Sequence, residues 1–419
     1  MMRRVFFVVV LVAAAAGGVL AQQNRIDTVT QVAPEFAAYG KYDIGVRTIT
    51  ATDRDRPDIV NTKEGSPTVM YDRTLTLEVW YPARLAANQN PGGEYRTIAR
   101  DPSIAVTLYG KAVRDAAPLT TEGAFPLVII SHGYPGNRFL MSHLGENLAS
   151  KGFVTVSIDH KDSTYDDQTA FGSTLYNRSF DQLFVLKEVA RLGLAGAGSF
   201  LSGLVDASRT GIVGYSMGGY GVVNVVGGGY SPASVTLNQA PPNKLLAARA
   251  ATNPDYQKSM DPRIKAAIAI APWGMQGGFW DAEGLKGIRT PILFVAGSMD
   301  STAGYERGTK AIYQGAVNAD RYLLTFINAN HNAGAPIPAP VETYGTSAFT
   351  HYADAVWDNA RMNNILDHFA AVYFDLYLKG DEEKKTYLDL IPEPKDAAWK
   401  GFKARTAVGL MLEHTTAGK

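Results

Sequence analysis

A serine flanked by glycines is the first feature of this sequence that could do chemistry. The segment GYSMG at residues 214–218 fits the pattern G-x-S-x-G, in which a serine stands on a sharp turn between a strand and a helix. Side chains two positions to either side of that serine would collide, so the turn requires glycine there. A strand-like run at 209–215 leads into the motif, and a helix-like run at 217–226 leads out of it. This context predicts Ser216 as a nucleophile rather than a bystander in a glycine-rich turn.

A serine hydroxyl is a weak nucleophile at neutral pH, so it needs an imidazole to take its proton and a carboxylate to orient that imidazole. When the serine stands on a strand-to-helix turn, the acid and then the histidine follow it along the chain. Asp300 comes shortly after the apolar run 291–296, and His331 lies in the loop after the apolar run 322–327. We therefore predict Asp300 as the acid and His331 as the base.

Other carboxylates and histidines fit this order less well. Asp300 could instead cap the helix that is expected to begin near Ala303, while Glu306 and Asp320 fall further from a strand end. The remaining histidines either precede the serine or follow the last clear strand: His132, His143, His160, His351, His368 and His414. His331 alone has the expected chain order, loop and preceding strand.

Ester or amide cleavage through a serine also needs two main-chain N–H groups that stabilise the tetrahedral oxyanion. One comes from the residue after the nucleophile, which is Met217, and the other from the loop after an early strand. The segment SHGYPG at 131–136 follows such a strand, and Pro135 has no N–H to offer. We predict Tyr134 and Met217 as the two donors; the alternative is a glycine-rich turn without a role.

The elements that must position these residues alternate between strand and helix from about residue 126 to residue 378. The predicted strands are 126–130, 153–158, 209–215, 264–271, 291–296 and 322–327, and the predicted helices are 139–150, 179–194, 217–226 and 354–378. Such alternation is typical of βαβ units. It predicts an α/β fold with a mostly parallel central sheet and helices on both faces.

The outer parts of the chain complete the predicted organisation. Residues 1–21 form a signal peptide, 22–72 an N-terminal extension with an edge strand at 44–51, 73–380 the catalytic domain, which opens with a strand at 73–81, and 381–419 a C-terminal extension without an assigned role. Two insertions interrupt the catalytic domain. The first, 82–124, is expected to be a long loop with one short helix, and the second, 227–262, is a candidate cover for the active site.

The composition limits the kind of partner. Of 419 residues, 46% are hydrophobic and 19% charged, a balance typical of a globular protein. Lys and Arg together number 40, as do Asp and Glu, so the formal net charge is zero. This argues against a nucleic-acid partner or a polybasic membrane surface. The chain has no cysteine, which excludes disulfides and thiolate metal sites, and the predicted chemistry implies no metal or organic cofactor.

The N-terminus has the pattern of an export signal. Arg3 and Arg4 precede an apolar run at 5–16, and small residues follow up to Ala21. The apolar run is short for a membrane span, which needs about 20 residues, so an uncleaved anchor is the weaker alternative. We predict cleavage after Ala21, a secreted or periplasmic protein, and no stable membrane anchor.

Several segments together resemble a known family. These are SHGYPGNRF, LASKGFVTVSIDHKDS, GYSMGGYG, DPRIKAAIAIAPWG, PILFVAGSMD and NHN. They resemble the dienelactone-hydrolase-like branch of the α/β-hydrolase superfamily. Within it, the chain is similar to bacterial relatives of the platelet-activating-factor acetylhydrolases and to polyester-degrading cutinases, which share the G-x-S-M-G-G turn and an A-P-W after a strand.

The resemblance covers about residues 73–378 and implies the α/β-hydrolase fold. It also implies site residues: Ser216, Asp300 and His331 as the triad, Tyr134 and Met217 as oxyanion donors, and Trp273 as a wall of the acyl or aromatic subsite. Trp280 and Phe171 are candidates to join that wall. Two departures matter. Cutinases of this kind usually carry a disulfide, which this chain cannot form, and dienelactone hydrolases proper use a cysteine nucleophile.

Taken together, the sequence predicts a serine carboxylic ester hydrolase that works through an acyl-enzyme intermediate. The expected substrate is a small-molecule or polymeric ester, short or medium in length, with an apolar or aromatic part bound by Trp273, Tyr134 and Met217. An amidase or peptidase with the same triad and a cutinase-like polyester hydrolase are the alternatives. A catalytically inactive binding protein of the same fold is a third, from a different functional class.

Overall fold

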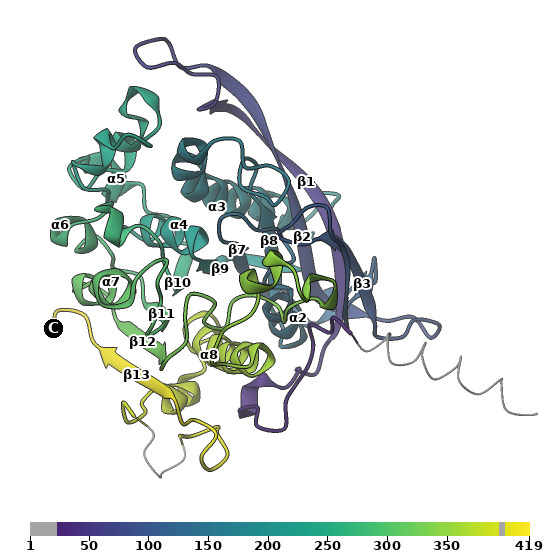
Figure 1. Ribbon diagram of the computed structural model, residues 1–419. Helices are drawn as coiled ribbons and strands as arrows, with labels where there is room; N and C mark the ends of the chain where they lie inside the picture. Colours follow the sequence, from purple (N-terminus) through teal and green to yellow (C-terminus); the bar gives the residue numbers. More distant parts are fainter. Residues whose placement is uncertain (1–22, 394–398) are drawn as a thin grey trace, which may run out of the picture.

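An eleven-stranded mixed sheet runs through the part of the chain that this computed structural model describes, residues 23–393 and 399–419 (Figure 1). Its centre is a block of six parallel strands in the order β8, β7, β9, β10, β11, β12. Their bounds are β7 Phe125–Ser131, β8 Val154–Asp159, β9 Val205–Tyr215, β10 Ile264–Ile270, β11 Ile292–Gly297 and β12 Arg321–Phe326. The expected mostly parallel central sheet is therefore present.

Antiparallel strands extend the sheet at both edges. Beyond β8 lie β2 (Met70–Arg84) and β1 (Asp43–Pro57), and beyond β12 lies β13 (Leu410–Thr415). The two-residue strands β5 (Val113–Arg114) and β6 (Ala117–Pro118) pair with β1 and β2. The sheet thus takes strands from both ends of the described chain.

Helices cover both faces of the sheet (Figure 1). Helices α2 (Ser142–Ser150) and α8 (Asn359–Lys379) pack on one face, and α3 (Phe171–Gly193) and α4 (Met217–Val225) pack on the other. The shorter helices are α5 (Pro254–Lys258), α6 (Ala282–Leu285) and α7 (Lys310–Gly315). Strand β7 shows why both faces need cover, since Val128 and Ile130 join one core while Leu127 and Ile129 join the other. Burial on both sides explains its unbroken apolar sequence.

The predicted strands and helices match the structure to within a few residues in the central block, with α3 beginning eight residues earlier than expected, at Phe171 rather than residue 179.

The first insertion differs from the prediction. Residues 82–124 contain the expected short helix, a 3-10 turn at Thr120–Glu122, but also an antiparallel hairpin of β3 (Gly93–Ile98) and β4 (Ala105–Gly110) where a loop is predicted. Tyr95 and Leu108 of the hairpin are buried in the core, so its apolar residues pack against distant segments that local sequence does not reveal.

The second insertion does not cover the site. Within 227–262, Tyr230 stacks on Tyr220 of α4 at a centroid distance of 5.6 Å, and Arg249 lies 4.4 Å over the ring of Phe180 of α3. Tyr256 donates a hydrogen bond to the carbonyl of Asn224. The segment therefore packs against α3 and α4, and the expectation that it lies over the active site is wrong.

The C-terminal extension is part of the folded unit rather than an appendage. Strand β13 pairs with β12 along six residues, and Trp399 is 2% exposed. The indole of Trp399 donates to the carbonyl of Ile391 at 2.9 Å and meets the ring of Phe369 in α8 edge-on.

The residues before position 23 include the predicted signal peptide, which lies outside the described residues. Within those described, no helix has the length and apolar character needed to span a bilayer.

Replacing Trp399 with alanine should lower the free energy of unfolding by about 3–5 kcal/mol, because a buried indole leaves a cavity that the core fills only in part. Denaturant unfolding of the full chain followed by intrinsic fluorescence and circular dichroism measures this change. Val408→Ala is the matched control, since Val408 is 54% exposed in the same tail. Equal midpoints for the two variants would show that the tail does not support the core.

Candidate active site

The turn between β9 and α4 holds Ser216 in a strained backbone conformation. Its φ is 53° and its ψ is −112°, a region that L-residues rarely adopt. A Cβ on Gly214 would lie 2.2 Å from the carbonyl oxygen of Gly218, and a Cβ on Gly218 would lie 2.0 Å from that of Ser131. The glycines of the motif are therefore needed for the close approach of strand, turn and helix, as the pattern predicts.

Ser216, His331 and Asp300 form one continuous chain of hydrogen bonds. The distance from Ser216 Oγ to His331 Nε2 is 2.9 Å, and that from His331 Nδ1 to Asp300 Oδ2 is also 2.9 Å. The three side chains follow strands of the same parallel block: Ser216 follows β9, while Asp300 and His331 follow the adjacent strands β11 and β12, with β10 between β9 and β11. The structure thus brings together the three residues that the motif and chain order select.

The environment of Asp300 favours its carboxylate form. Burial acts to raise its pKa, but the hydrogen bond and charge of His331 and the N–H groups of Ala303 and Thr302 outweigh burial and lower the pKa below its ordinary value. The two N–H groups bind Asp300 Oδ1 at 2.9 and 2.8 Å. These bonds close the turn at 301–304 and do not cap a helix, since the next helical element, Tyr305–Thr309, follows Gly304; they leave Oδ2 for the imidazole.

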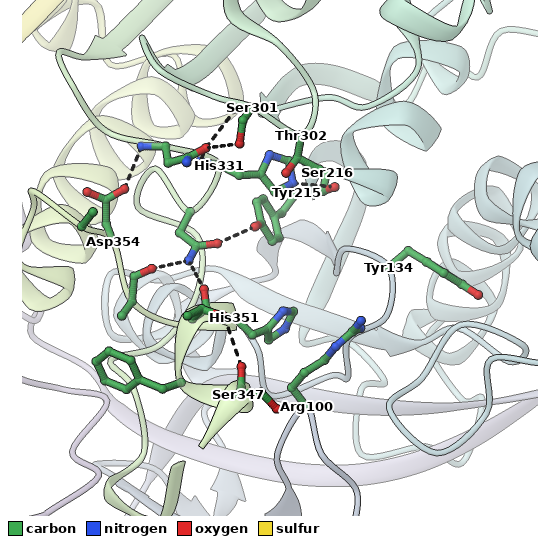
Figure 2. A pocket seen from close by; sticks show the side chains of 16 residues that line it. Arg100, Tyr134, Tyr215, Ser216, Ser301, Thr302, His331, Ser347, His351 and Asp354 are labelled. Atoms are coloured by element: carbon green, nitrogen blue, oxygen red, sulfur yellow. Dashed lines mark hydrogen bonds between the residues drawn. The ribbon is translucent and has the colours of Figure 1, made fainter. Parts of the chain in front are cut away.

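A second set of contacts ties the histidine loop to its neighbours. The Asn330 side-chain oxygen accepts the N–H of Ser301 at 3.0 Å, while the Asn330 N–H donates to Asp354 at 2.7 Å (Figure 2). Behind the imidazole, the ring of Tyr215 lies 5.2 Å from that of His331 and its hydroxyl donates to Asn332 at 3.0 Å. These bonds join the loops that carry Asp300 and His331 into one frame.

The two predicted oxyanion donors have no protein acceptor among the described residues, because no hydrogen bond uses the N–H of Tyr134 or Met217. Met217 begins α4, where helix N–H groups have no intrahelical partner. In the loop before Tyr134, the buried guanidinium of Arg178 donates to the carbonyls of His132 and Gly133. Arg178 therefore fixes which way these peptide groups point.

A buried polar network lies behind the same loop. Ser131 Oγ is 2.8 Å from His160 Nε2, His160 Nδ1 is 3.0 Å from Asp181, and Arg73 donates to Asp181 at 2.8 Å. Burial lowers the pKa of His160 to about 3, so this histidine is neutral. The contacts repeat those of a Ser-His-Asp triad, but each of the three side chains is within 2% of full burial. The network supports the loop and is closed to substrate.

A cavity of about 680 Å³ opens beside Ser216 (Figure 2). Its wall has aromatic, hydroxyl, amide and charged parts, supplied chiefly by Tyr134, Tyr215, Phe349, Ser301, Thr302, Ser347, Thr350, Asn330, Asn332, His351, Asp354 and Arg100. Arg100 comes from the 82–124 insertion, and none of the lining residues belongs to 227–262. The mixed wall suits a ligand with both an apolar ring and polar groups.

The predicted substrate-binding side chains divide into two groups. Tyr134 lines the cavity, but Trp273 and the side chain of Met217 do not. Met217 is 2% exposed and packs in the core, so only its N–H faces the site chemistry. Trp273 is half-buried and meets Phe171 at right angles with 5.5 Å between the rings, and Phe171 in turn meets Tyr134 at 5.2 Å. Trp273 is therefore the far end of an aromatic row beside the cavity, rather than a wall of it.

Comparison with known proteins agrees with this architecture. A family model described as PET hydrolase-like matches residues 91–244, a range that contains Ser216 and ends before Asp300 and His331. A solved structure of a ferulic acid esterase from Streptomyces cinnamoneus superposes with a TM-score of 0.57 at 20% identity, covering 85% of this chain and 94% of that one. The fold is the α/β-hydrolase fold.

Curated relatives of this α/β-hydrolase include a bis(hydroxyethyl) terephthalate hydrolase of Streptomyces coelicolor, 26% identical over 63% of this chain and 68% of that one. Cutinase est1 of Thermobifida alba is 25% identical over 56% of this chain and 62% of that one, so the match spans somewhat under two thirds of the cutinase. These relatives are named as ester hydrolases. The predicted resemblance to the polyester-degrading cutinases and the predicted carboxylic ester hydrolase class are confirmed.

Replacing Arg178 with methionine should destabilise the protein, because each buried acceptor left without a donor costs about 1–3 kcal/mol and Arg178 serves two carbonyls and a serine hydroxyl. Thermal unfolding of the full chain measures the loss. Arg191→Met, in the same helix α3, removes only an exposed ion pair with Glu188 and should leave the midpoint unchanged. Equal midpoints for the two variants would contradict the support that we assign to Arg178.

Proposed function

We propose that Ser216, His331 and Asp300 are the catalytic triad of this α/β-hydrolase, with Tyr134 and Met217 as its oxyanion hole. The observation that carries the proposal is the unbroken chain of hydrogen bonds from the Ser216 hydroxyl through the imidazole to a carboxylate. Ser216 and His331 line a cavity that can admit an ester, and Asp300 lies behind the imidazole. A catalytically inactive binding protein would not need these three side chains to be hydrogen-bonded in this order.

In the first half-reaction, Ser216 Oγ attacks the ester carbonyl carbon while His331 Nε2 takes the hydroxyl proton. The negative charge that forms on the carbonyl oxygen is stabilised by the free N–H groups of Tyr134 and Met217. When the carbon–oxygen bond to the alcohol breaks, the imidazolium returns its proton to the departing oxygen. An acyl-serine ester and a free alcohol result.

In the second half-reaction, water takes the place of the alcohol. His331 accepts a proton from water as the oxygen attacks the acyl-serine carbonyl, and the same two N–H groups hold the second oxyanion. Collapse of the intermediate breaks the bond to Ser216 Oγ, which recovers its proton from the imidazolium. The carboxylic acid leaves, and Asp300 stabilises the imidazolium at both stages without itself gaining the proton.

The substrate that fits the site best is a short or medium ester with an aromatic or apolar part. The row of Tyr134, Phe171 and Trp273 offers ring edges and faces beside the cavity, which suit flat apolar groups. One relative is named for an ester of an aromatic acid, bis(hydroxyethyl) terephthalate, and the esterase of similar fold is named for ferulic acid, itself an aromatic acid. A polyester chain is the second candidate, favoured by the cutinase relatives.

We further propose export to the periplasm or medium, directed by residues 1–21 with cleavage after Ala21.

Replacing Ser216 with alanine should lower the rate of hydrolysis of 4-nitrophenyl esters by several orders of magnitude, because the hydroxyl forms the covalent bond to the acyl group. The fold should survive, so the melting curve should stay at or above that of the wild type. A fluorophosphonate probe should label the wild type and not the variant. Matched 4-nitroanilides in the same assay separate ester from amide cleavage. Near-normal turnover by a folded Ser216→Ala protein would remove Ser216 from the mechanism.

Replacing Asp300 with asparagine should lower kcat by about four orders of magnitude, because an amide cannot hold His331 in the tautomer that accepts the serine proton. The pKa of Asp300 is lowered in the fold, so its stabilisation is present above the ordinary aspartate pKa of about 3.9 and is lost as pH falls through the lowered value. The stability difference between the wild type and Asp300→Asn should therefore shrink as pH falls below about 3.9. A pH-independent difference in unfolding midpoint, or a variant with near-normal kcat, would contradict this account.

A further inference from the structure

Arg100 is a cation in the cavity wall for which the described residues offer no counterion. It lines the cavity beside Ser216 (Figure 2), and none of the ion pairs among the described residues involves it. Its Nη1 is buried and has no hydrogen-bond partner. A buried guanidinium nitrogen without an acceptor is costly, so this group is suited to an acceptor that arrives with a ligand.

The main chain holds Arg100 firmly at this place. Its N–H donates to the hydroxyl of Tyr352 at 3.0 Å, and the preceding Ala99 is 1% exposed and donates to Ile104 at 2.9 Å. The residue thus follows β3 on an anchored turn of the β3–β4 hairpin. Little backbone ordering remains to be done when a ligand binds, which favours a specific contact.

The other titratable groups of the cavity wall do not neutralise Arg100. Asp354 accepts the N–H groups of Asn330, Val356 and Trp357 at 2.7–2.9 Å and makes no ion pair with Arg100 among the described residues, and His331 is paired with Asp300. His351 is 3.0 Å from the hydroxyl of Tyr165. Burial, followed by the charge of Arg100, lowers the pKa of His351 to about 3, so this histidine is neutral.

The two tyrosines of the wall are neutral as well. Burial raises the pKa of Tyr134 and of Tyr215 above the ordinary phenol value. Neither can supply a negative charge at neutral pH. The corner of the cavity formed by Arg100 and His351 therefore carries one positive charge that no neighbour balances.

We propose that Arg100 binds a carboxylate of the substrate, so that the preferred substrates are esters that also carry a free carboxylate. The inference rests on the proposed esterase function of the same cavity. A guanidinium and a carboxylate match in charge and can share two parallel hydrogen bonds. One cation balances one carboxylate and leaves a phosphate dianion half neutralised. Half-esters of dicarboxylic acids belong to this class, and hydrolysis of one ester group of a diester is the reaction that supplies them.

The test compares acids with neutral analogues as substrates of one enzyme preparation. Mono(2-hydroxyethyl) terephthalate against bis(2-hydroxyethyl) terephthalate places the carboxylate on the acyl side, and 4-acetoxybenzoate against its methyl ester places it on the alcohol side. The readout is the ratio of kcat/KM for acid to that for neutral ester. An inactive or misfolded fraction cancels in this ratio, so a less stable variant still gives a valid result.

Wild-type protein should favour the acid in at least one pair by about tenfold or more, the range expected for hydrogen bonds to a charged group. Arg100→Leu should lower that ratio by about the same factor, and Arg100→Lys, which keeps the charge without the planar fork, should retain part of it. Arg96→Leu is the matched control, because Arg96 lies on β3, four residues before Arg100, and its side chain is 85% exposed. Its ratio should equal that of the wild type.

The possible failures are distinct. Hydrolysis of the neutral esters with no preference for either acid would overturn the role of Arg100 and leave the esterase function in place. A preference that survives in Arg100→Leu would also overturn it, since another group would then bind the carboxylate. Absence of hydrolysis of all four compounds would contradict the proposed function itself, and the inference with it.

Discussion

One chain of hydrogen bonds runs from Asp300 through His331 to Ser216. The rest of the structure must hold these three side chains within hydrogen-bonding distance of one another. The two 2.9 Å contacts join three loops that are 84 and 31 residues apart in sequence, the differences between positions 216, 300 and 331. The carboxyl edge of the parallel sheet brings these loops together, because every strand in the block ends on the same side. The six parallel strands are therefore the base of the site, and their burial on both faces fixes where the three loops begin.

Polar contacts, exposed at the histidine loop and buried behind Tyr134, hold the site residues in place. Asn330 links the acid and histidine loops through Ser301 and Asp354. On the opposite side, Arg178 binds the carbonyls before Tyr134, and the closed network of Ser131, His160 and Asp181 lies behind them. The buried members of this second set would be costly to leave unpaired in the interior. The same cost draws attention to Arg100, whose buried Nη1 has no partner among the described residues and whose side chain lines the cavity beside Ser216.

Sequence alone predicts those parts of the fold and site whose signals lie within a short stretch of the chain. Ser216, Asp300 and His331 each follow an apolar strand, in the chain order expected of a triad. The glycines around Ser216 also indicate a tight turn, so the sequence alone selects these three residues. Trp273 was misplaced because the direction of its ring depends on Phe171 from a different element. Arg178 and Arg100 carried no local signal at all, since their partners and their cavity come from segments far along the chain. The hairpin of β3 and β4 and the tail strand β13 were missed for the same reason.

The central claim is that ester cleavage passes through a covalent acyl bond to Ser216. A rapid acid quench of the enzyme mixed with a short 4-nitrophenyl ester, followed by peptide mass analysis, tests it most directly. The account predicts a burst of one nitrophenol per active site and an acyl group on the peptide that carries Ser216. Turnover without that adduct, or an acyl group on a different residue, would contradict it.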